Sequence, residues 1–108
     1  MLAEIALFTP DVDATVSFYE RVLGLQPESR WPGGATFDLA GVTLLIHAQG
    51  DQARDDQADG MPANVDHVAF RVTDLDAEAT RLGTEAADYP WGRSAYLRDP
   101  DGRLVELQ

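Results

Sequence analysis

Four side chains of this sequence have residue types and positions that suit the binding of a divalent metal ion: Glu4, His47, His67 and Glu106. His47 and His67 are the two histidines of the chain. A pair of imidazoles with a pair of carboxylates is a good ligand set for a divalent transition metal such as Ni, Co, Zn, Mn or Fe. A metal ion held in this way can act as a Lewis acid on two neighbouring oxygens of a small substrate, while a carboxylate moves a proton.

We expect these four residues to come together because the chain contains an internal repeat. The segment NVDHVAFRVTDLDAEA (64–79) repeats MLAEIALFTPDVDATV (1–16) at an offset of 63, which pairs His67 with Glu4. In each copy a strand-like run precedes apolar residues at the i, i+4, i+7 spacing of a buried helical face. These apolar residues are Val12, Val16 and Tyr19 in the first copy and Leu75, Ala79 and Leu82 in the second.

The ends of the two expected helices carry capping residues. Aspartates stand where an N-cap belongs, and glycines stand where each helix should end. The candidates are Asp11 or Asp13 with Gly24, and Asp74 or Asp76 with Gly83.

Three short strand-like segments follow each helix and are separated by turn sequences such as PGG and DPDG. They span about 25–30, 35–39 and 42–48 in the first copy and about 84–88, 94–98 and 103–107 in the second. Their ends match at a second offset, 59, which pairs His47 with Glu106. The pattern predicts an α+β fold, in which two βαβββ modules form a cleft between curved mixed sheets. We expect a single domain over 1–108, with modules at about 1–48 and 64–108 and an acidic connector over 49–63.

Alternation along the strands assigns side chains to faces. Ile5, Leu7, Leu44 and Ile46 should pack under the first helix, and Val68, Phe70 and Val72 under the second. Glu4 and Phe8 then face the cleft, as do His47, His67, Arg71 and Glu106.

Composition excludes several kinds of chemistry and partner. The chain has no cysteine and no lysine, so disulfides, thiolate zinc sites and lysine Schiff bases are excluded. The formal charge of −11 disfavours nucleic acid and anionic membranes as partners. No segment has the length and apolarity of a membrane span or the layout of a signal peptide, so we expect a cytoplasmic protein. Ser17, Ser29 and Ser94 lack the context of a nucleophile elbow.

Three segments on this duplicated pattern carry a family resemblance: FYERVLGL (18–25), HVAFRVTDLDA (67–77) and DPDGRLVEL (99–107). The chain resembles the vicinal oxygen chelate superfamily, which includes glyoxalase I, extradiol dioxygenases, fosfomycin-resistance enzymes and bleomycin-resistance proteins. The resemblance implies metal ligands at the first and last strands of each module, which are Glu4, His47, His67 and Glu106. Glu4 stands where relatives usually have His or Gln, and His47 where they have Glu or Gln. A dioxygenase is disfavoured because that group has histidine at the place of Glu4.

The resemblance implies two alternative functions. The first is a metal-dependent lyase or isomerase of the glyoxalase type, which acts on a small substrate with vicinal oxygens and uses Glu106, or else Glu4, as the base. The second is a metal-free protein that sequesters an aromatic or cationic compound, as bleomycin-resistance proteins do. A homodimer is implied in either case. Arg71 is a candidate for binding an anionic substrate group, or pairs with one of the many acids. Four aromatic residues are candidates for the pocket wall, the core or a dimer contact: Phe8, Trp31, Trp91 and Tyr96.

Overall fold

Two successive βαβββ units build the chain in the computed structural model, which describes residues 1–49 and 65–108. The first unit comprises β1 (Leu2–Thr9), α1 (Val12–Leu23), β2 (Ser29–Trp31), β3 (Gly34–Leu39) and β4 (Val42–Ala48). The second comprises β5 (His67–Phe70), α3 (Leu75–Arg81), β6 (Ala86–Tyr89), β7 (Gly92–Arg98) and β8 (Leu104–Leu107). The predicted α+β class and the repeated order of elements are confirmed. Apart from Gln49, the predicted connector lies outside the described residues.

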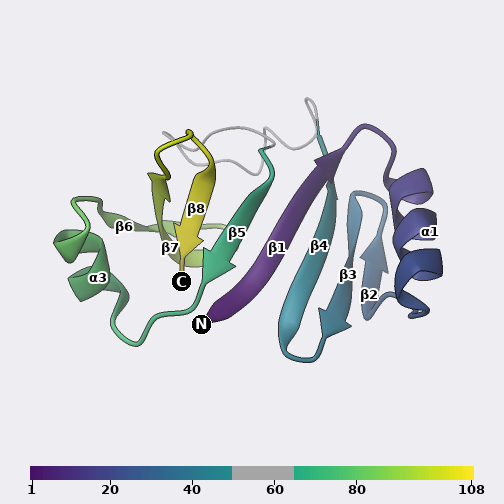
Figure 1. Ribbon diagram of the computed structural model, residues 1–108, viewed down its shortest axis with the longest axis horizontal. Helices are drawn as coiled ribbons and strands as arrows, with labels where there is room; N and C mark the ends of the chain where they lie inside the picture. The colour runs from purple at the N-terminus through teal and green to yellow at the C-terminus, as the bar shows by residue number, and fades with distance from the viewer. Residues whose placement is uncertain (50–64) are drawn as a thin grey trace.

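The two units form one curved eight-stranded sheet in the order β2-β3-β4-β1-β5-β8-β7-β6 (Figure 1). Within each unit the first and last strands are parallel, as β1 with β4 and β5 with β8. The units meet edge to edge, because β1 pairs antiparallel with β5 at the centre of the sheet. The first strands of the two modules are therefore neighbours, and each has the last strand of its own module on its other side.

The helices begin at the aspartates nearest the preceding strand. Asp11 accepts a hydrogen bond from the Ala14 amide at 3.0 Å, and Asp74 accepts one from the Ala77 amide at 3.1 Å. These contacts select Asp11 and Asp74 from the two pairs of candidate N-caps. Gly24 ends α1 in the left-handed region at φ 66°, which glycine adopts without strain. Neither helix in the described part of the chain is long and apolar enough to cross a membrane.

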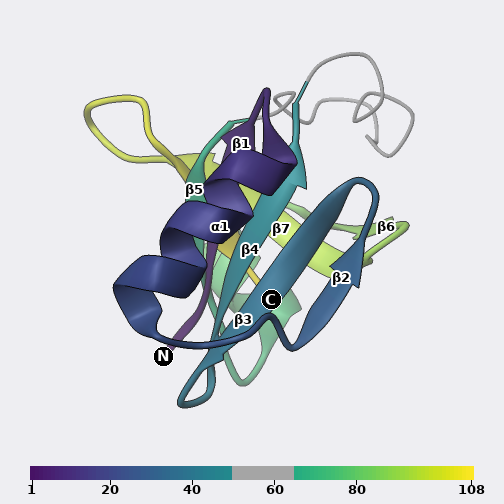
Figure 2. The same cartoon turned by 90° about the vertical axis from the view of Figure 1, so that its right-hand side faces the viewer.

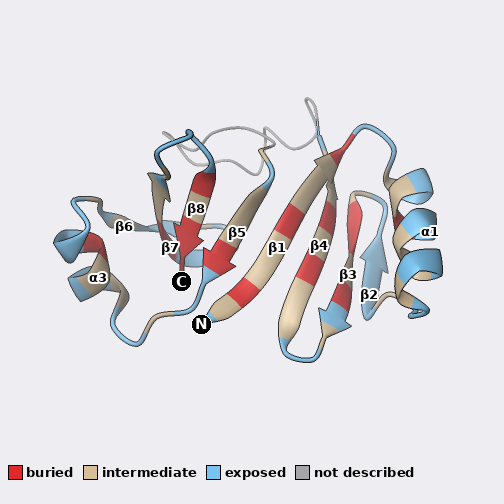
Figure 3. Cartoon of the chain, viewed as in Figure 1, coloured by how far each residue is buried: buried red, intermediate tan, exposed pale blue. Residues whose placement is uncertain are grey.

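Each helix packs on the same face of the sheet as the apolar strand residues assigned to it. Val16 of α1 lies against Phe37, Leu44 and Ile46, with Ile5 and Leu7 packed around them, as predicted. Figure 2 shows α1 in front of β1 and β4, and Figure 3 shows buried segments in β1, β3 and β4. The second core is built around Ala79, Ala95 and Leu107. Its small side chains bury less apolar area and so contribute less hydrophobic stabilisation. The opposite face of the sheet carries neither α1 nor α3, the two helices within residues 1–49 and 65–108, and is called the open face.

Two predicted core residues of the second module are only partly covered. Phe70 is 37% exposed and Leu82 is 41% exposed. Leu82 follows the last residue of α3, so it does not continue the buried face of that helix.

Candidate metal centre

Three of the four expected ligands come together on the open face. Glu4, His67 and Glu106 each offer a ligand atom, and these atoms all lie within 4.8 Å of one another. The strand register explains the cluster. Ala69 pairs with Glu4 on one side and with Glu106 on the other, and His67 lies two residues before Ala69 on the same strand. Ala69 is fully buried, and its small side chain leaves space between the two carboxylates.

His47 is not part of this cluster, and the offset that placed it there was wrong. Ala6 pairs with Leu45 in the first module, while its repeat counterpart Ala69 pairs with Glu106 in the second. Leu45 is therefore the structural counterpart of Glu106, at an offset of 61. His47 lies two residues further along β4, opposite Phe8, and its Nδ1 is 2.7 Å from the Ala48 carbonyl oxygen. A two-residue shift leaves a side chain on the same face but moves it by about 7 Å along the strand.

The hydrogen bonds of His67 orient its imidazole toward the cluster. Nδ1 lies 2.9 Å from the Val65 carbonyl oxygen, and Nε2 lies 3.2 Å from Oε2 of Glu106. Burial alone would lower the pKa of His67, but the bonds to Glu106 and Val65 and the nearby carboxylate charges outweigh it and raise the pKa. A backbone acceptor at Nδ1 leaves Nε2 for a metal, which is the usual arrangement of a histidine ligand.

The two carboxylates of the cluster differ in how readily they take up a proton. The pKa of Glu4 is raised by burial and by the charge of Glu106, against the opposing effect of His67. Burial also acts to raise the pKa of Glu106, but hydrogen bonds from His67 and Ser94 outweigh it, and the pKa is lowered. Of the two candidate bases in the sequence analysis, Glu4 is therefore the one that holds a proton more readily.

Ser94 is a further residue of the site, for which the sequence indicates no role. It is 2% exposed, and its hydroxyl donates a hydrogen bond of 2.6 Å to Oε1 of Glu106. No pattern within β7 indicates this role, because the contact depends on the register in which β7 pairs with β8, where Tyr96 is the partner of Glu106 and Ser94 shares its face.

The donor set fits a divalent cation. Two carboxylates held close together on a largely dehydrated surface repel each other, and a cation between them removes that repulsion. Burial, and after it the charge of Glu106, raise the pKa of Glu4. One imidazole with two carboxylates suits first-row divalent metals.

Aromatic side chains extend from the cluster toward solvent. The Tyr96 ring is edge-on to His67 at a centroid distance of 6.5 Å, and its hydroxyl accepts a 3.0 Å hydrogen bond from Trp91 Nε1. Tyr89 stacks on Trp91 at 5.0 Å. Phe8 lies on the other side, 6.0 Å from the His67 ring. Three of the four candidate aromatics thus flank the cluster, and Tyr89 joins them.

Two further candidates lie away from the cluster. Arg71 is exposed and follows the last residue of β5, and its backbone exchanges hydrogen bonds with Met1. Trp31 lies beside Gly34, where a Cβ atom would come within 2.8 Å of its ring. Gly34 is the register partner of His47, so Trp31 stands near that histidine.

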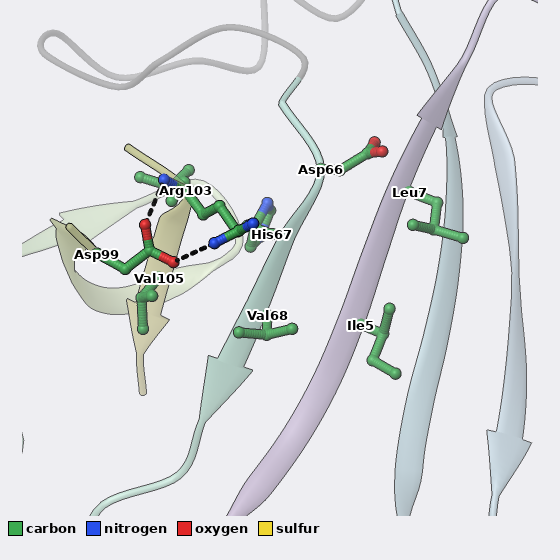
Figure 4. Close-up of a pocket in the computed structure, with 9 residues that line it drawn as sticks. Ile5, Leu7, Asp66, His67, Val68, Asp99, Arg103 and Val105 are labelled. Atoms are coloured by element: carbon green, nitrogen blue, oxygen red, sulfur yellow. Dashed lines mark hydrogen bonds and ion pairs between the residues drawn. The ribbon is translucent and has the colours of Figure 1, made fainter. Parts of the chain in front are cut away.

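A groove lies where the two modules meet, between residues of β1, β5 and β8, and His67 is among the residues that line it (Figure 4). Its floor is apolar and includes Ile5, Val68 and Val105. Arg103 at its edge is paired with Asp99 at 3.2 Å. Ile5, Val68 and Val105 alternate along their strands with Glu4, His67 and Glu106, so the two carboxylates lie on the opposite face of the sheet. His67 nevertheless contributes to the lining of the groove.

The fold and the cluster define a protein built from two repeated βαβββ modules with candidate ligands on the inner strands. The family model described as the Glyoxalase/Bleomycin resistance protein/Dioxygenase superfamily matches residues 1–107, and the chain belongs to this family. It is 33% identical to a protein named Metallothiol transferase FosB from Shouchella clausii (strain KSM-K16), over 90% of this chain and 71% of that protein. It is 29% identical to one named Glutathione transferase FosA from Serratia marcescens, over 98% of this chain and 78% of that protein.

A solved structure supports the same fold. A glyoxalase/bleomycin resistance protein/dioxygenase superfamily member from Vibrio splendidus 12B01 superposes with a TM-score of 0.69. The match covers 99% of this chain and 97% of that one, at 18% sequence identity.

Proposed function

We propose that this protein is a metal-dependent enzyme that modifies a small molecule at a centre formed by Glu4, His67 and Glu106. The observation that carries the proposal is the convergence of three ligand atoms within 4.8 Å from three adjacent strands. The Nδ1 contact of His67 supports it, because this contact directs Nε2 toward the carboxylates. The relatives named as metallothiol and glutathione transferases also favour a metal-dependent enzyme.

The number of ligands determines what such a centre can bind. Three protein ligands on a six-coordinate ion leave three positions, enough for two neighbouring substrate oxygens and one further group. Leu45, at the counterpart of Glu106, adds no fourth ligand. When bound, the metal would supply Lewis-acid polarisation of the substrate oxygens. Glu4 would accept or release the proton at its carboxylate, and the aromatic residues near Tyr96 would exclude water from one side.

The reaction class follows from this open coordination and from the relatives. A third open position admits a second reactant, such as a small thiol, beside the substrate oxygens. We therefore place group transfer between small molecules ahead of the lyase or isomerase reaction expected from the sequence. The homodimer and the cytoplasmic location are also predictions. Light scattering after size-exclusion chromatography measures the molar mass and so tests the homodimer.

Metal titration of matched variants tests the proposal. Protein purified without chelator is titrated calorimetrically with Mn²⁺, Co²⁺, Ni²⁺ and Zn²⁺. We expect one equivalent to bind, and we expect His67→Gln and Glu106→Gln to abolish tight binding. His47→Gln is the matched control, because it removes the other histidine of the open face, and it should bind as the wild type does. Absence of stoichiometric binding, or equal losses in both histidine variants, would refute the proposed centre.

A second candidate function is metal-free binding of an aromatic or cationic compound. It is favoured by the aromatic contacts of Tyr89, Trp91 and Tyr96 and by the His67–Glu106 ion pair, whose members satisfy each other without a metal. Tryptophan fluorescence with a cationic aromatic dye in the presence of EDTA tests it. Saturable quenching that Trp91→Ala removes would support sequestration, and the absence of quenching would exclude it for that class of compound.

A further inference from the structure

Ser94 contacts the candidate metal centre from a position that has no access to substrate. It lies on β7, the strand next to β8, and 2% of its surface is exposed. Its Oγ donates to Oε1 of Glu106 at 2.6 Å, while Oε2 of the same carboxylate lies 3.2 Å from Nε2 of His67. Each carboxylate oxygen thus has its own partner, and the two partners come from opposite sides of β8.

This division of contacts fixes the orientation of the carboxylate. The terminal torsion of a glutamate is broad and otherwise poorly restrained. A charge-assisted bond to one oxygen restrains it and directs the other oxygen toward His67 and Glu4. We propose that Ser94 is a positioning residue that holds Glu106 so that Oε2 alone is offered to the metal. This inference rests on the proposed function, because it assigns Ser94 a role toward that metal.

The burial of the pair distinguishes this contact from an ordinary bond between strands. Ser94 and Glu106 are 2% and 4% exposed, so loss of the hydroxyl would leave Oε1 without this donor in a dehydrated place. Ser29 and Thr36 form a hydroxyl pair of the same 2.6 Å length between β2 and β3, but that pair is exposed and involves no carboxylate. Ser29 therefore provides a matched control for the removal of one hydroxyl from a strand.

Cobalt binding tests the inference without an activity assay. The variants Ser94→Ala, Ser94→Thr and Ser29→Ala are titrated with Co²⁺, and affinity and the visible absorption band are recorded. We expect Ser94→Ala to weaken binding by about 10- to 100-fold, as for other groups that orient a ligand. Its absorption band should change in intensity, because Glu106 becomes free to coordinate through both oxygens. Ser94→Thr keeps the donor and should restore both properties, and Ser29→Ala should match the wild type.

The outcomes separate this inference from the proposed function. If the wild type binds Co²⁺ and Ser94→Ala binds it with the same affinity and spectrum, Ser94 has no positioning role and the metal centre stands. If the wild type binds no Co²⁺, the proposed function itself fails. Circular dichroism of the metal-free variants reports whether they fold. Should Ser94→Ala fail to fold, Ser94→Cys replaces it, since a thiol is a weak donor of similar size, and a wild-type affinity in that variant would also overturn the inference.

Discussion

Replacement of Leu45 by glutamate tests the register that separates His47 from the cluster. Leu45 is placed relative to Glu4 as Glu106 is placed relative to His67. In each case the residue lies on the adjacent parallel strand, two positions beyond the register partner of the other. Glu106 bridges that separation and comes within 3.2 Å of His67. A glutamate at 45 should therefore reach Glu4 and supply a fourth ligand. Glu4 pairs with Thr43, and His47 lies four residues further along β4. The distance along the strand is about 13 Å, which is beyond the reach of a side chain.

The effect of Leu45→Glu should change sign with metal. Without metal, a third carboxylate about 5 Å from Glu4 adds about 3 kcal/mol of repulsion at an effective dielectric of about 20. We therefore expect the apoprotein to lose stability by about 2–3 kcal/mol, the remainder being relieved by protonation of Glu4. With metal, the extra ligand should tighten Mn²⁺ binding by at least about tenfold, which corresponds to about 1.4 kcal/mol.

Two assays measure these opposite effects. Urea unfolding with EDTA gives the stability of the apoprotein, and calorimetric titration gives Mn²⁺ affinity. Leu45→Gln controls for the loss of leucine, and His47→Glu places the same charge where the sequence offset expected a ligand. Leu45 is not the counterpart of Glu106 if His47→Glu tightens Mn²⁺ binding as much as Leu45→Glu does, or if Leu45→Glu leaves both the stability and the affinity unchanged.

Three further predictions concern the same cluster and the second helix. His67→Ala should destabilise the apoprotein by about 3 kcal/mol at neutral pH in urea unfolding, because it removes the ion-pair partner of the buried Glu106 carboxylate. Glu106→Gln in the same background should recover part of that loss. Because the pKa of His67 is raised in the folded protein, the stabilisation that protonated His67 gives the apoprotein should be complete in acid and should be lost as pH rises through that pKa. Co²⁺ affinity should rise over the same pH interval, because Nε2 loses its proton. A Co²⁺ affinity that does not change with pH would contradict this prediction. Asp74→Ala should lower stability by about 1 kcal/mol through loss of the α3 N-cap, while Asp76→Ala should have a smaller effect in the same thermal or urea assay.

Much of the fold could be predicted from the sequence, because its signals are local or repeated. The offset of 63 aligned β1 with β5, and the i, i+4, i+7 pattern located α1 and the start of α3. Two-residue alternation placed Ile5 and Leu7 against the helix, and hence Glu4 on the other face. Local periodicity reports which face a side chain occupies, and this is sufficient to bring Glu4, His67 and Glu106 to one side of a sheet.

Only the tertiary structure decided how far along each strand a side chain lies. Alternation has a period of two, so residues two apart on β4 lie on the same face of the sheet. The sequence offset could therefore assign His47 as the counterpart of Glu106 without any error in face, although the register shows that the counterpart is Leu45. The contact of Ser94 with Glu106 was hidden for a related reason, since it depends on the pairing of β7 with β8 and not on any pattern within β7. Sequence periodicity therefore determined the faces, whereas the hydrogen-bond register between strands determined which side chains meet.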